Sequence, residues 1–169
     1  VEEQFYLFWP VLAWFAQKRR VSPYNLTLVV AIASFALNVA SIRHDAVSTF
    51  YSPHTRIWEL LGGALLAHFV MQRVSSIEED KPSANVRSIL GLALVVASAF
   101  WLGKEKAFPG WWALLPTSGA ALVLSAGPSA WFNRIALSNR VLVWTGLVSY
   151  PLYLWHWPLL SFARILTGT

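Results

Sequence analysis

The sequence predicts an all-α fold, a polytopic bundle of about six transmembrane helices, and three observations support this prediction. Of the 169 residues, 56% are apolar and only 12% are charged, whereas soluble domains carry about 25% charged residues. The mean hydropathy is +0.50. Charged residues also divide the chain into a series of long apolar segments. These features exclude a disordered chain, which needs low hydrophobicity and high charge, and they argue against a water-soluble domain.

Six apolar segments follow one another along the chain, at residues 4–17, 21–42, 60–72, 88–103, 107–133 and 141–163. A spanning helix needs about 20 residues, so the second, fifth and sixth segments are long enough. The first and third approach this length if they begin at Val1 and Pro53, and we expect helices over 1–17 and 53–72. For the short segments, the alternative is a buried or interfacial helix. The fifth segment is interrupted by Pro109, Pro116 and Pro128.

The basic residues predict how the helices are oriented. If the first helix runs from outside to inside, eight Lys and Arg residues lie on the inner side and five on the outer side. Cytoplasmic loops carry an excess of Lys and Arg, so this orientation is favoured. Its strongest support is the triplet at the end of the first segment, Lys18, Arg19 and Arg20. We expect a multi-pass protein of the inner (plasma) membrane.

A first polar group lies at the start of the chain, where Glu2 and Glu3 precede Tyr6 by four and three residues. Residues at these spacings are neighbours on a helix surface. Acidic side chains are stabilised at a helix N-terminus, which is a sufficient structural explanation for them. The functional alternative is a carboxylate that orients or deprotonates a catalytic base elsewhere in the bundle.

A second polar group combines Arg56, Trp58 and Glu59 at the start of the third segment. Arg56 and Glu59 are three residues apart and are expected to form a buried pair on one helix face. Gly62 and Gly63 follow on the side of Glu59 and leave room for a neighbouring backbone. The alternative is an ion pair that only fixes the position of the helix.

A third polar group lies in the last segment, where Ser149, Tyr153 and His156 form a stripe at helical spacing, with aromatic residues beside it. An aromatic belt at the membrane interface explains the Tyr and Trp residues. It does not explain a His in the middle of a span, because an ionisable residue within a membrane helix is a functional hypothesis by default.

Several other functions are excluded by the residue types that are absent. Four scattered His and no Cys give no metal-ligand spacing. No phosphate loop or nucleophile elbow is present. The basic residues form short clusters between apolar runs, which is typical of membrane topology rather than of nucleic-acid binding.

The three polar groups together resemble the acyltransferase-3 family of integral membrane acyltransferases. The similar strings are VEEQFYL at 1–7, RIWELLGGAL at 56–65 and SYPLYLWHWP at 149–158, with FPG at 108–110 between them. The resemblance implies that residues 1–169 are part of a single membrane domain of roughly ten helices. It also implies transfer of an acyl group, often acetyl, from acyl-CoA to a hydroxyl of an extracytoplasmic carbohydrate. The implied partners are acyl-CoA, the glycan acceptor and membrane lipid, with no bound cofactor and no nucleic acid.

The resemblance also implies roles for individual residues. The basic residue and His of the family's first helix, usually taken as catalytic, have no counterpart here, so this chain alone is expected to be inactive. Supporting catalytic roles fall on Glu2, Glu3 and His156. Substrate-binding roles fall on Tyr6, Arg56, Trp58, Glu59, Ser149, Tyr150, Tyr153 and Trp155. Two other classes stay open, a transporter or flippase-like bundle and a purely structural bundle.

Overall fold

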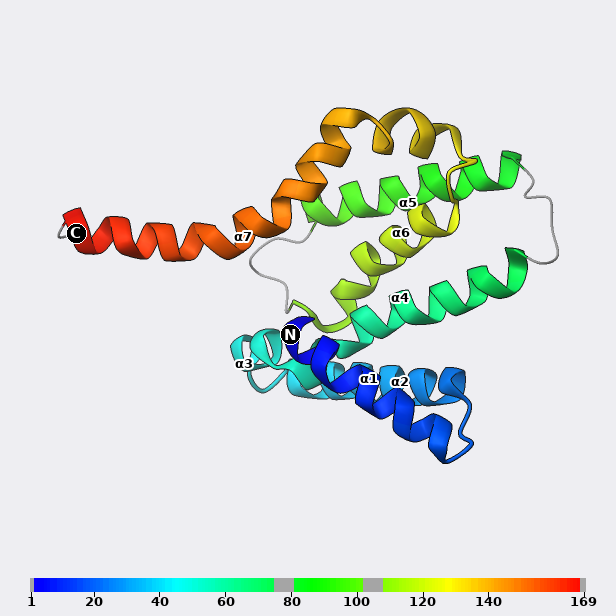
Figure 1. Cartoon of the computed structure of the whole chain (residues 1–169), viewed down its shortest axis with the longest axis horizontal. Coiled ribbons are helices and arrows are strands. Elements are labelled where there is room, and N and C mark those ends of the chain that lie inside the picture. The colour runs from blue at the N-terminus through cyan, green and yellow to red at the C-terminus, as the bar shows by residue number, and fades with distance from the viewer. Residues whose placement is uncertain (1, 75–80, 102–107, 168–169) are drawn as a thin grey trace.

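The computed structural model describes residues 2–74, 81–101 and 108–167, without the side chains of Glu2, Glu3, Arg73, Val74 and Lys81. All regular secondary structure in these ranges is helical, which confirms the all-α prediction. Figure 1 shows α1, α2 and α4 on one side of the molecule and α5 and α6 on the other. In chain order the helices are α1 (Glu2–Lys18), α2 (Pro23–Ser41), α3 (Ala46–Tyr51), α4 (Pro53–Val74), α5 (Lys81–Trp101), η1 (Gly110–Ala113), α6 (Leu114–Ser125), η2 (Asn133–Leu137) and α7 (Arg140–Thr167).

The helix boundaries in the first half follow the sequence prediction closely. The expected helices over 1–17 and 53–72 correspond to α1 and α4. Pro23 and Pro53 each stand at the first position of a helix, where the missing N–H has no intrahelical partner to lose. The short helix α3 was not expected. The carboxylate of Asp45 caps it by accepting a hydrogen bond from the Ser48 N–H at 3.0 Å.

Helices α5 and α6 pack closely against each other, and two glycines make the close approach possible. A Cβ atom added to Gly91 would lie 2.6 Å from the carbonyl oxygen of Gly119, and one added to Gly119 would lie 2.8 Å from the carbonyl oxygen of Gly91. Small residues at a helix crossing let two backbones touch, as in many membrane bundles.

The expected fifth segment, 107–133, is not one continuous helix. It contains η1, the 12-residue helix α6 and the start of the π-helix η2. Gly127 adopts a positive φ of 65° and Pro128 follows it, so the chain turns directly after α6. Pro116 is tolerated because it lies in the first turn of α6. At a rise of 1.5 Å per residue, α6 alone is about 18 Å long.

Helix α7 packs against η2 and then projects away from the other helices (Figure 1). No residue of α7 is buried. Pro151 and Pro158 lie inside it and each removes a backbone hydrogen bond, and Figure 1 shows that the helix is bent.

Most buried positions hold small or polar residues, with Phe5, Ile42, Trp58 and Leu61 as the bulky apolar exceptions, and most bulky apolar residues are exposed. Ala16, Ala84, Ala113, Ala126 and Ala130 are buried, as are the polar side chains of Ser34, Asn38, Thr55, Ser88 and Asn133. Most large apolar residues, including the Trp residues of α7, are exposed. Within the part of the chain that the structure describes, two helices, Pro23–Ser41 and Pro82–Trp101, are long and apolar enough to cross a membrane. The six-span arrangement therefore stays a prediction.

Candidate functional site

The predicted pair of Arg56 and Glu59 is present at the start of α4. The Arg56 Nη2 donates to Glu59 Oε2 at 2.9 Å, and Arg56 Nε donates to Glu59 Oε1 at 3.2 Å. Two parallel bonds from one guanidinium to one carboxylate are the strongest geometry of such a pair. The side chains are 26% and 22% exposed, so the pair is half-buried rather than fully buried as the sequence predicted.

A third side chain, Phe50 of α3, holds the Arg56 guanidinium from one face. The Arg56 Cζ lies 4.8 Å from the centre of the Phe50 ring, within the range of a cation–π contact. The sequence prediction missed Phe50, because α3 was read as part of a connector.

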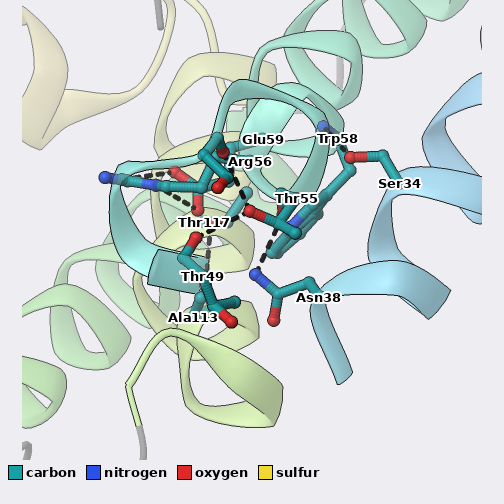
Figure 2. A network of polar contacts seen from close by, with 10 residues as sticks. Ser34, Asn38, Thr49, Thr55, Arg56, Trp58, Glu59, Ala113 and Thr117 are labelled. Atoms are coloured by element: carbon teal, nitrogen blue, oxygen red, sulfur yellow. Dashed lines mark hydrogen bonds and ion pairs between the residues drawn. The ribbon is translucent and has the colours of Figure 1, made fainter. Parts of the chain in front are cut away.

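Hydrogen bonds within the connector fix the first turn of α4 (Figure 2). The buried hydroxyl of Thr55 lies 2.6 Å from the Thr49 carbonyl oxygen and 2.8 Å from that of Ser52, and donates toward both. The end of α3 and the start of α4 are thereby joined next to the Arg56–Glu59 pair.

Two polar side chains of α2 bond directly to the backbone of α4 (Figure 2). The Ser34 hydroxyl donates to the His54 carbonyl at 2.7 Å and accepts from the Trp58 N–H at 3.2 Å. These two backbone groups are four residues apart, the spacing of one α-helical hydrogen bond, and the hydroxyl bonds to both. The Asn38 Nδ2 donates to the Thr55 carbonyl at 2.9 Å. The sequence analysis missed both, although two polar residues four apart in an apolar span were a usable signal.

Trp58, a predicted substrate-binding residue, is 7% exposed and lies inside the packing. Its ring meets Phe35 edge-on at 4.9 Å, and Phe35 meets Trp111 edge-on at 5.2 Å. Among the described residues, neither the Trp58 indole N–H nor the buried Asn38 Oδ1 has a hydrogen-bond partner. Buried polar atoms normally have one.

On α1, the predicted site residue Tyr6 is exposed, and its ring meets that of Phe5 edge-on at 5.9 Å. The predictions for Glu2 and Glu3 lie outside the side chains that the structure describes. An apolar cavity of about 580 Å³ lies between α1, α2 and α4, with Phe5, Val30 and Ile57 among its lining residues. Ile57 follows Arg56 in the chain, but neither Arg56 nor Glu59 is among the lining residues of this cavity.

The predicted stripe on α7 is present as a common face. Ser149, Tyr153 and His156 line one hollow of about 410 Å³ together with apolar neighbours. The His156 Nδ1 lies 2.6 Å from the Tyr153 carbonyl oxygen, which only accepts hydrogen bonds, so Nδ1 is the N–H donor. In the neutral ring the Nε2 atom is then an acceptor. The other predicted residues of α7, Tyr150 and Trp155, are exposed.

The predicted site residues therefore form separate groups. Arg56, Trp58 and Glu59 lie on α4, whereas the stripe lies on α7, which projects away from α4 (Figure 1). The structure does not bring the stripe to the pair. In the described part of the chain, no group of three or more His, Asp or Glu residues is arranged to hold a metal ion.

Comparison with known proteins gives one family and several relatives. The family pattern described as an acyltransferase domain matches residues 1–168. The chain is 30% identical over 172 residues to the putative peptidoglycan O-acetyltransferase YrhL of Bacillus subtilis (strain 168), covering 95% of this chain and 27% of that protein. It is 28% identical over 176 residues to the O-acetyltransferase OatA of Staphylococcus aureus (strain NCTC 8325 / PS 47), covering 97% of this chain and 29% of that protein.

The chain thus spans less than a third of the length of these curated relatives. No solved structure matches it.

Proposed function

Because this chain belongs to the acyltransferase-3 family, we propose that it is part of a membrane O-acyltransferase. In this proposal the protein moves an acyl group, acetyl by analogy with its relatives, from acyl-CoA to a hydroxyl of an extracytoplasmic glycan. The observation behind the proposal is the similarity of nearly the whole chain to proteins named O-acetyltransferases, one of them of peptidoglycan. A peptidoglycan hydroxyl is therefore the first acceptor to test.

A multi-pass location in the plasma membrane is supported by the distribution of side chains. Most large apolar residues are exposed and most buried residues are small or polar, whereas a soluble core is built mainly from bulky apolar residues. Helix packing in lipid favours small residues and interhelical hydrogen bonds. The Ser34 and Asn38 bonds to α4 and the Gly91–Gly119 contact fit that pattern. Six spans and a single domain over residues 1–169 belong to the same proposal.

In the proposed reaction, the acceptor hydroxyl oxygen attacks the thioester carbonyl carbon and the carbon–sulfur bond breaks. The hydroxyl proton passes to a base, and the leaving thiolate takes up a proton. We assign a supporting part in this proton transfer to Glu2, Glu3 and His156, whose Nε2 is an acceptor in the neutral ring. The fixed Arg56 guanidinium and Glu59 would contact the acceptor, together with Tyr6 and Trp58. The remaining substrate contacts would come from α7, at Ser149, Tyr150, Tyr153 and Trp155.

The test is a strain that lacks the full gene. Ester-linked acetyl groups on its cell-wall glycan are expected to disappear and to return when the wild-type gene is supplied. The Glu59→Gln variant should restore less ester than the wild type when both are present at equal abundance.

Unchanged ester-linked acetyl in the deleted strain would contradict the proposal. Unchanged esters together with a solute that fails to cross the membrane would instead favour a transporter. Lost esters that Glu59→Gln restores fully would keep the enzyme but remove Glu59 from the site.

A further inference from the structure

A second cavity, not part of the site described above, lies at the opposite end of α4. It measures about 580 Å³, which is a common size for a small-molecule site. Unlike the apolar cavity beside α1, it has polar as well as aromatic walls, which come from two helices, α2 and α4. Its lining residues are Tyr24, Leu65, Leu66, His68, Phe69 and Gln72.

The polar walls of this cavity suit a planar heteroaromatic ring. The Tyr24 ring stacks with the His68 ring at 5.1 Å and 30°, although the two residues come from different helices. Gln72 Nε2 lies 2.9 Å from His68 Nε2, which places an amide beside the stacked rings. Aromatic faces bind nucleic bases by stacking, and an amide reads their edges by hydrogen bonding.

A cluster of basic residues lies at the same end of the molecule. α1 ends at Lys18, and Arg19 and Arg20 follow it in the turn; all three are exposed, and α2, which contains Tyr24, begins at Pro23. Figure 1 shows the turn between α1 and α2 at the same end of the molecule as the last turns of α4. Lys and Arg side chains are the usual partners of phosphate groups. A ring-binding cavity beside such a cluster fits a nucleotide.

A strip of the α4 surface at Gly62 and Gly63, here called the track, connects this cavity with the Arg56–Glu59 pair. Gly62 follows Glu59 by three residues and precedes Leu66 of the cavity by four, so the three lie along one side of the helix. A Cβ atom added to Gly62 or Gly63 would meet nothing within 4 Å. Glu59 and Leu66 are seven residues apart, about 10 Å along the helix axis.

We propose that this cavity binds the nucleotide end of the acyl donor. The base would lie against the Tyr24–His68 pair and the phosphates toward Lys18–Arg20, while the acyl-bearing arm follows α4 past Gly62 to the Arg56–Glu59 pair. The inference rests on the proposed function for the identity of the donor, acyl-CoA. The nucleotide-binding role of the cavity stands on its own walls and charge.

The experiment uses the full-length protein in lipid nanodiscs, with CoA and adenosine 3′,5′-bisphosphate as probes of direct binding by calorimetry. Tyr24→Leu should weaken binding of both probes about tenfold or more. Phe100→Leu, an exposed aromatic position on α5, is the control and should bind both normally. Inorganic pyrophosphate should compete only weakly, because it has no base.

A second pair of variants tests the track. Gly62→Leu should bind adenosine 3′,5′-bisphosphate normally but lose most acyl transfer, whereas Gly62→Ala should keep most of it.

Normal bisphosphate binding by a folded Tyr24→Leu protein, or no bisphosphate binding by an active wild type, would overturn the cavity assignment. Equal competition by pyrophosphate would overturn the role of the stacked rings. Full transfer by Gly62→Leu would overturn the track. Bisphosphate binding without any acyl transfer would instead contradict the proposed function and leave the nucleotide cavity standing.

Discussion

The Arg56 guanidinium is held from two directions, by the Glu59 carboxylate at its edge and by the Phe50 ring at its face. A guanidinium is planar and has five N–H donors in a fixed fork. Because Nε and Nη2 bind Glu59, the orientation of Nη1 is fixed as well. A lysine at this position has a single ammonium group and no planar face, so it would not reproduce this arrangement.

Breaking the Arg56–Glu59 pair is expected to be worse than replacing it. Glu59→Gln leaves the guanidinium half-buried without its counter-charge. Breaking a fully buried pair lowers the free energy of unfolding by about 3–5 kcal/mol. The loss should be smaller here, because both side chains are about a quarter exposed. Abundance of the full-length protein in membranes, measured by immunoblot, should therefore fall.

The double variant Arg56→Met with Glu59→Leu separates a bracing role from a substrate role. Abundance should recover, because a paired apolar replacement is near neutral, while acetyl transfer should remain lost. Full activity of the double variant at normal abundance would show that the pair only braces the bundle.

At the scale of single residues, sequence spacing was informative only within one helix. A separation of three residues is enough to predict the Arg56–Glu59 pair, because helix geometry alone brings such residues together. The contacts of Phe50, Ser34 and Asn38 with α4 depend on how α2, α3 and α4 pack. No local spacing specifies that packing.

At the scale of helices, the charges that interrupt the apolar segments predicted α1, α2 and α4 well. In the segment 107–133 the sequence predicted three proline interruptions but not which of them ends a helix; the backbone turns at Gly127 and Pro128, although hydropathy stays high. Hydropathy reports burial in lipid or protein and does not report continuity of the helix. The placement of α7 relative to α4 was also beyond the sequence, since it depends on contacts between distant segments.

The α5–α6 crossing gives a prediction at this scale. Gly91→Ala places a Cβ atom 2.6 Å from the Gly119 carbonyl oxygen, so the two backbones must move apart. Overpacking of this kind costs about 1–3 kcal/mol, and the melting temperature of the purified protein should fall. Gly146→Ala is the control, because a Cβ atom there meets nothing within 4 Å and alanine favours the helix. An equal or higher melting temperature for Gly91→Ala would show that the two helices do not touch at this point in the full protein.

At the scale of the whole molecule, the basic residues and α2 together predict the orientation in the membrane. The two ends of α2 are about 28 Å apart at 1.5 Å per residue, close to the thickness of the hydrocarbon core. The Lys18–Arg20 end should lie inside and the α3 end outside.

Single cysteines test this orientation, since the chain has none of its own. An impermeant maleimide added to intact cells should label Ala46→Cys and Ser48→Cys and should miss Arg20→Cys and Ser22→Cys. The latter two should react after the membrane is opened. Val29→Cys, within α2, is the control that reacts only after denaturation. Labelling of Arg20→Cys but not of Ala46→Cys in intact cells would reverse the orientation.

The hydroxyl of Ser34 has a mechanical consequence. Because it binds both the His54 carbonyl and the Trp58 N–H, α2 cannot slide by one residue against α4 without breaking both bonds. The hydrogen bond from Asn38 to the Thr55 carbonyl, one turn further along α2, restricts the same sliding motion. The two helices are therefore expected to move together as one rigid body. A tilt of α2 at the Tyr24 end would then also move Arg56 at the other end of the pair.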